Sequence, residues 1–134
     1  MLKIIEVHPA SGVGGEYVVL QNQGLVTVSL RGWALCTDVY LLDDATQVAN
    51  EMYVFREDVA IKPYTRVVLF TGDGESEWVP TTDGKQAYCA YWGRSERIWT
   101  HATNIHVLHI AASRRIVASP NGLSLPASTG VYTA

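Results

Sequence analysis

The side chains best suited to metal binding in this 134-residue chain are its four histidines. His101, His106 and His109 are close in sequence, and His8 is far from them. Zinc requires three or four ligands that converge on one point. Because His106 and His109 are an odd number of positions apart, they would point to opposite faces of a β-strand. We therefore expect edge or loop histidines, with no metal site and no cofactor.

Three carboxylates, Asp73, Glu75 and Glu77, share one glycine-containing segment. Oxygen-rich loops at the end of a β-sandwich can bind calcium. The spacing matches no dedicated calcium-binding loop, so we expect a solvated hairpin tip. The same expectation holds for the pair Asp43-Asp44.

The sequence offers no recognisable setting for nucleophilic catalysis. Neither Ser11 nor Ser124 lies in a nucleophile elbow, and Cys36 has no identifiable histidine partner. No glycine-rich phosphate loop precedes a helix. Cys36 and Cys89 are too few for a disulfide scaffold; a single bridge between them stays open, but two free, partly buried thiols are favoured. We expect a protein without catalytic activity.

The aromatic residues of segment 78–99 are the strongest candidates for ligand binding. They are Trp78, Tyr88, Tyr91, Trp92 and Trp99. Aromatic side chains in and beside a long loop are suited to stacking on a sugar, a peptide or a partner protein. The alternative is that Trp92 and Trp99 fill one end of the core, whereas the polar neighbours of Trp78 indicate exposure.

Composition indicates one globular domain and excludes several partners. Apolar residues make up 48% and charged residues 17% of the chain, and the net charge is −3. Lys and Arg are scattered singly, so we expect no binding to nucleic acid or to an anionic membrane. The first residues read as a strand rather than a signal peptide, and no apolar run could span a bilayer. This predicts a cytoplasmic protein, or an extracellular one if a signal was removed.

Two apolar runs, Tyr17–Asn22 and Arg66–Thr71, are typical of central strands. Between them, Leu30 and Trp33 would fall on opposite faces of a flat strand. A bend at Gly32 would return Trp33 to the core. The predicted core side chains are Val18, Leu20, Leu30, Trp33, Leu35, Val67 and Leu69.

Turn signals recur along the chain and no segment shows sustained helical periodicity. This pattern predicts an all-β protein, an antiparallel sandwich or barrel of about seven to nine strands. Segment 43–47 is either a short helical turn or a hairpin tip, and segment 75–85 is a long loop. The domain is expected over residues 1–119. Residues 120–134, rich in Pro, Gly, Ser and Thr, would form a loosely docked tail or an extra edge strand.

In chain order, several segments resemble the lamin tail domain family. These are Gly15–Leu20 with Asn22, Val28–Leu35, Phe55, Ile61–Pro63 followed by Val67–Gly72, then Trp92-Gly93, Trp99 and residues 104–117. The resemblance implies an immunoglobulin-like β-sandwich with a binding role. It does not imply which ligand is bound.

Departures from the family pattern leave two points open. Val19 stands where the family often has an acidic residue, which suggests an apolar patch on the outer face of the sheet. Ser113-Arg114 replaces a turn glycine, so either Ile105 and Val107 or Leu108 and Ile110 face the core. The sequence thus predicts a non-catalytic module that binds an unknown protein partner, or alternatively a carbohydrate or cell surface through the aromatic segment. It does not predict an oligomeric state.

Overall fold

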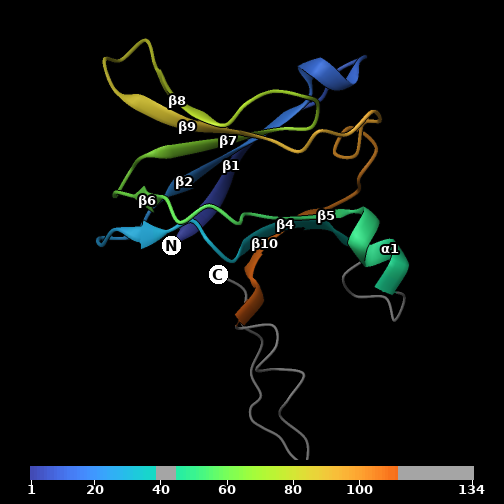
Figure 1. Ribbon diagram of the computed structural model, residues 1–134, viewed down its shortest axis with the longest axis horizontal. Coiled ribbons are helices and arrows are strands. Elements are labelled where there is room, and N and C mark those ends of the chain that lie inside the picture. Colours follow the sequence, from blue (N-terminus) through green and yellow to red (C-terminus); the bar gives the residue numbers. More distant parts are fainter. Residues whose placement is uncertain (39–44, 112–134) are drawn as a thin grey trace, which may run out of the picture.

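The computed structural model describes residues 1–38 and 45–111 of the chain. Figure 1 shows two layers of strands, which confirms the predicted all-β sandwich. The strands are β1 (Leu2–His8), β2 (Tyr17–Asn22), β3 (Val28–Ser29), β4 (Trp33–Thr37), β5 (Met52–Val54), β6 (Ala60–Ile61), β7 (Arg66–Phe70), β8 (Glu77–Pro80), β9 (Gln86–Tyr91) and β10 (Ile105–His109). The helices are the 3-10 turn η1 (Val13–Gly15) and α1 (Ala45–Asn50). The pair Asp43-Asp44 and the tail predicted at 120–134 lie outside the described residues.

The first layer is a five-stranded sheet in the order β1-β2-β7-β9-β8. All its neighbouring strands are antiparallel except β7 and β9, which run parallel. After β7 the chain passes to the sheet edge, forms β8 there, and returns to insert β9 between β7 and β8. The segment predicted as a long loop therefore contains an edge strand, and that part of the loop prediction is wrong.

The second layer bends at Gly32. Strands β10, β4 and β5 form one part of it, and the β3–β6 pair forms the other. Hydrogen bonds from Leu30 N to Val59 O (2.8 Å) and from Gly32 N to Phe55 O (2.9 Å) continue the pairing across the bend. Gly32 has a φ of 91°, in the left-handed region that favours glycine. The predicted bend is therefore present.

The main core lies between the two layers. All the predicted core side chains belong to it, together with Leu2, Phe55, Ile61, Tyr88 and Trp99. Ile105 and Val107 of β10 pack against this core. Leu108 lies on the opposite face of β10, in a separate small cluster with Ala34 and Cys36. Of the two alternatives for β10, the one in which Ile105 and Val107 face the main core is therefore observed.

Substituting Gly32 tests the bend directly. An alanine there would adopt a left-handed backbone and place its Cβ 2.8 Å from His109 Nε2. Gly84 is a matched control because its φ of 80° is similar but nothing lies within 4 Å of an added Cβ. Gly84→Ala should lose about 1 kcal/mol of unfolding free energy from backbone strain. Gly32→Ala should lose roughly 1 kcal/mol more, because the His109 ring must move. Equal losses in urea unfolding would show that the Gly32–His109 contact is unimportant.

Candidate binding groove

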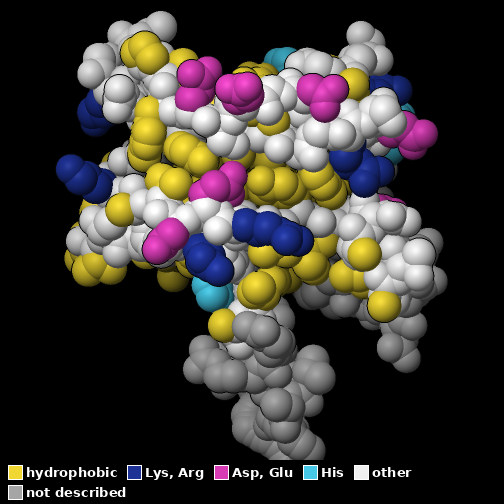
Figure 2. Space-filling view, in the orientation of Figure 1, with side chains coloured by type: hydrophobic (Ala, Val, Ile, Leu, Met, Phe, Trp, Pro, Cys, Tyr) yellow, Lys and Arg dark blue, Asp and Glu magenta, His cyan; other side chains and the backbone are white. Residues whose placement is uncertain are grey.

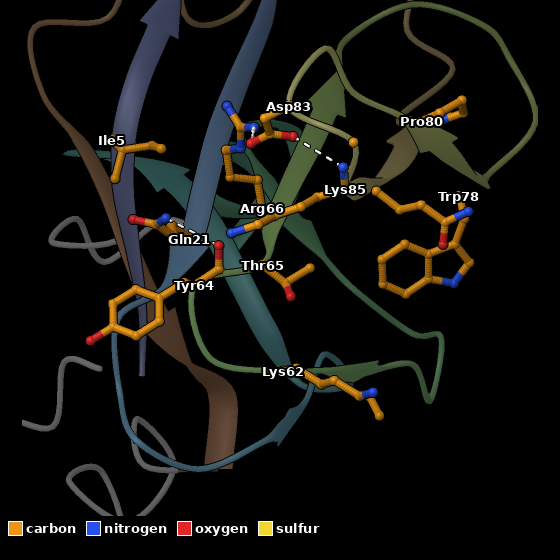
Figure 3. Close-up of a pocket in the computed structure, with 13 residues that line it drawn as sticks. Ile5, Gln21, Lys62, Tyr64, Thr65, Arg66, Trp78, Pro80, Asp83 and Lys85 are labelled. Atoms are coloured by element: carbon orange, nitrogen blue, oxygen red, sulfur yellow. Dashed lines mark hydrogen bonds and ion pairs between the residues drawn. The ribbon is translucent and has the colours of Figure 1, made fainter.

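A groove of about 900 Å³ opens at the end of the sandwich where the β6–β7 turn faces the β8–β9 hairpin. Its walls include Gln21 at the end of β2, Lys62 and Tyr64 in the turn, and Trp78 on β8. Tyr64 and Trp78 lie on opposite sides of the Arg66 and Lys85 side chains (Figure 3). The groove thus combines aromatic and cationic side chains on elements far apart in sequence.

Tyr64 occupies a tight turn in a conformation that disfavours its side chain. Thr65 N donates to Lys62 O at 3.1 Å, which closes the turn, and Pro63 fixes φ at its first central position. Tyr64, at the second central position, has a φ of 66°. Among the described residues it is the only non-glycine residue with positive φ. Type II turns place glycine or asparagine at this position, so Tyr64 is strained by about 1 kcal/mol or more.

Hydrogen bonds to the end of β2 hold this turn rigidly. Tyr64 N donates to Asn22 O at 2.6 Å, and Asn22 N donates to Thr65 O at 3.1 Å. The Gln21 side chain donates to Tyr64 O at 3.1 Å. Tyr64 is nevertheless 59% exposed. A rigid backbone therefore presents an aromatic side chain to solvent beside the groove.

Trp78 forms the opposite wall. Its ring packs edge-on against Tyr88 with centroids 5.4 Å apart, yet it remains 39% exposed. Figure 2 shows other hydrophobic side chains at the surface along the seam between the two layers. Pro80, two residues further along β8, lacks an N–H group and so limits pairing of this edge strand with another chain. The indole, rather than the strand edge, is what this wall offers to a ligand.

The groove is electropositive although the chain is acidic. It is lined by Lys62, Arg66 and Lys85 and by a single carboxylate, Asp83. Arg66 pairs with Asp83 at 3.3 Å. Hydrogen bonds from the Thr81 hydroxyl and the Lys85 N–H lower the pKa of Asp83, which keeps it ionised at neutral pH. Three positive charges and one negative charge leave a local excess of +2.

The five aromatic residues predicted as a binding group do not form one surface. Trp78 lines the groove, whereas Tyr88 and Trp99 are 6% and 2% exposed and belong to the core. Trp92 packs on Trp99 with centroids 5.6 Å apart, and the Arg94 guanidinium lies 5.0 Å from its centroid. Of the two predictions made for Trp92 and Trp99, the structure agrees with the one in which they pack at the core.

Tyr91 belongs to a row of rings on the outer face of the five-stranded sheet. The row runs His8, Tyr17, Phe70, Tyr91, with successive centroids 4.5, 5.4 and 4.9 Å apart. It follows from the strand register, which pairs each of these residues with the next. His8 stacks on Tyr17 and Phe70 stacks on Tyr91, so these rings turn their faces toward one another rather than outward. The row is therefore poorly suited to stacking on a sugar.

Val19 lies on the same outer face and is 7% exposed. With Tyr17 and Phe70 it lines a smaller groove of about 350 Å³. Val19 therefore lies on the outer face of the sheet, as predicted, but little of its side chain is accessible to a ligand.

The histidines do not converge. His106 Nε2 lies 2.6 Å from Asp38 Oδ1, whereas the His109 ring packs on Trp33, with centroids 5.5 Å apart. Hydrogen bonds from His106 and Asn104 lower the pKa of Asp38. Within residues 1–38 and 45–111, no three His, Cys, Asp or Glu side chains are grouped closely enough to hold a metal ion.

Both cysteines are free and buried. Cys36 is on β4 and Cys89 is on β9, in different layers. Burial, reinforced by the charge of Asp38, raises the pKa of Cys36 to about 12. Burial and the nearby Glu77 also raise the pKa of Cys89. Neither thiol has the lowered pKa of an activated nucleophile.

Comparison with protein-family models, with curated proteins and with solved structures finds no match to this chain. Of the helices that the structure describes, none has the length and apolar character needed to cross a bilayer.

Proposed function

We propose that this chain is a non-catalytic binding module of the lamin-tail type and that it holds a protein partner in the groove between Tyr64 and Trp78. The resemblance in the sequence supports the family, because its segments occur in order along a chain that folds as an all-β sandwich. The observation that carries the binding role is the pair of exposed aromatic rings on rigid backbone beside the groove. Aromatic side chains held in this way contribute strongly to protein interfaces because little conformational entropy is lost on binding.

A carbohydrate ligand is the second candidate, favoured by the exposed indole of Trp78. Sugars stack on exposed indole faces, and the lining residues Gln21 and Thr65 add polar groups. Against this, the groove also contains aliphatic side chains, which a hydroxyl-covered sugar contacts poorly.

Site-directed photo-cross-linking in the native cell separates these ligands. Trp78 is replaced by the photoreactive residue p-benzoylphenylalanine, and the same replacement at Leu25 serves as control. Leu25 is 87% exposed and does not line the groove. We expect a discrete protein adduct from position 78 and none from position 25. A glycan adduct, or equal adducts from both positions, would contradict a protein-binding groove.

A further inference from the structure

We propose that the groove recognises an acidic, extended peptide segment, whose carboxylates bind Lys62, Arg66 and Lys85 while its apolar side chains pack on Trp78 and Tyr64. This inference rests on the proposed function and specifies the partner's chemistry.

Charge complementarity is the first argument. The groove carries an excess of +2 on a chain whose net charge is −3. Within the described part of the chain, Arg66 forms an ion pair with Asp83, whereas Lys62 and Lys85 form none. Both lysines are exposed. Two accessible ammonium groups beside apolar walls favour a ligand that carries several carboxylates.

The strained turn is the second argument. The left-handed backbone of Tyr64 destabilises the fold, and a residue that is 59% exposed recovers little of that free energy through burial. Glycine at this position would remove the strain. The ring is therefore best explained by contacts with a ligand, in which it would be buried.

The remaining lining residues favour a peptide over an anionic polysaccharide. Ile5, Ala60 and Pro80 add aliphatic surface to the charged lining of the groove. A peptide in which acidic and apolar residues alternate can satisfy both kinds of surface, because successive side chains of an extended chain point to opposite sides. Because Pro80 limits pairing at the β8 edge, side-chain contacts must provide most of the affinity.

The chain's own C-terminal segment does not fit this description. Residues 112–134 contain Arg114 and Arg115 but no Asp or Glu. Their charge has the same sign as the groove, so this segment does not supply the carboxylates that the lysines would bind.

The test uses a fluorescent peptide of about eight alternating Asp and Leu residues, whose extended form rises roughly 3.3 Å per residue. Anisotropy should show saturable binding that weakens as salt increases. An Asn–Leu peptide should bind at least about tenfold more weakly. Equal binding of the two peptides, or no binding of the Asp–Leu peptide, would overturn the inference. Tighter binding of polygalacturonate would also overturn it in favour of an anionic polysaccharide, and concentration-dependent dimers would do so in favour of a second copy of the chain.

Two variants connect the binding to the groove. The double variant Lys62→Gln/Lys85→Gln should weaken binding of the Asp–Leu peptide about tenfold, whereas Lys3→Gln, at an exposed position that does not line the groove, should leave it unchanged. Tyr64→Gly should weaken binding without loss of unfolding free energy, because relief of strain offsets the added flexibility of glycine. Undiminished binding by either groove variant would refute the assignment.

If photo-cross-linking captures a protein at Trp78 but the Asp–Leu peptide does not bind, the proposed function stands and this inference fails.

Discussion

Replacing Glu16 by glutamine is expected to lower the unfolding free energy at pH 7 by about 3 kcal/mol. Glu16 is fully buried, and its carboxylate accepts four hydrogen bonds. Thr71 Oγ1 (2.6 Å) and Ile98 N (3.0 Å) donate to Oε1, and Thr100 N (2.7 Å) and Thr100 Oγ1 (2.5 Å) donate to Oε2. Glutamine would direct an amide N–H₂ group at two of these donors. The loss follows because buried donors would remain unpaired.

The same carboxylate makes the fold sensitive to acid. Burial raises the pKa of Glu16, but the hydrogen bonds from Thr100, Thr71 and Ile98 outweigh this and lower the pKa from 4.5 to about 2. Since the folded pKa lies below the unfolded value, the stabilisation is complete above pH 4.5 and is lost as the pH falls toward 2. The shift corresponds to about 3 kcal/mol.

Urea unfolding at pH 7, 5 and 3 checks this prediction. The parent protein should lose stability between pH 5 and 3, and Glu16→Gln should show a weaker pH dependence. Glu75→Gln is the matched control, because Glu75 is exposed and the charge change is the same. If the parent and the Glu16 variant lose stability equally in acid, this carboxylate is not the source of the effect.

Replacing Asn22 by aspartate is expected to have the opposite pH dependence. Asn22 is fully buried, and its Nδ2 donates to Val26 O and Ile61 O, both at 2.9 Å. Its Oδ1 accepts from Met1 N at 2.9 Å and Gly24 N at 3.0 Å. An aspartate has the same shape, but its ionised form presents an oxygen to two carbonyl oxygens. We expect a loss of about 3 kcal/mol at pH 7.

Protonation should partly rescue Asn22→Asp. The neutral carboxyl of this aspartate can donate to one of the two carbonyl oxygens, which the ionised form cannot do. Its destabilisation should therefore be smaller at pH 4 than at pH 7, as measured by urea unfolding. Gln23→Glu, at the exposed neighbouring position, is the control and should change stability by less than about 0.5 kcal/mol. A loss independent of pH would show that packing, rather than the two carbonyl contacts, determines the role of Asn22.

The central strands and the bend were predictable because their signals are local. The apolar runs around Val18 and Val67 identify buried strands, and the parity change between Leu30 and Trp33 locates the bend at Gly32. Glu16 gave no such signal, because all its side-chain partners come from segments distant in sequence. The same holds for two of the four partners of Asn22, Met1 and Ile61.

The groove was only partly predictable for the same reason. The polar neighbours of Trp78 indicated its exposure, and Pro63 indicated a turn. The positive φ of Tyr64 depends on hydrogen bonds with β2. That Tyr64 and Lys85 line the same groove depends on the position of the β8–β9 hairpin. Burial of Trp99 was one of two alternatives that the sequence left open, whereas no local signal indicated that Tyr88 is buried.

The insertion of β9 between β7 and β8 has a consequence for the order of folding. A hairpin such as β8–β9 closes through contacts between neighbouring residues, whereas the parallel β7–β9 pairing must close a longer loop, from Arg66 to Ala87. We expect the hairpin to form first and to join the sheet afterwards as a unit. Because Trp78 and Lys85 belong to that hairpin and Tyr64 does not, the groove would be assembled late, after most of the core has formed.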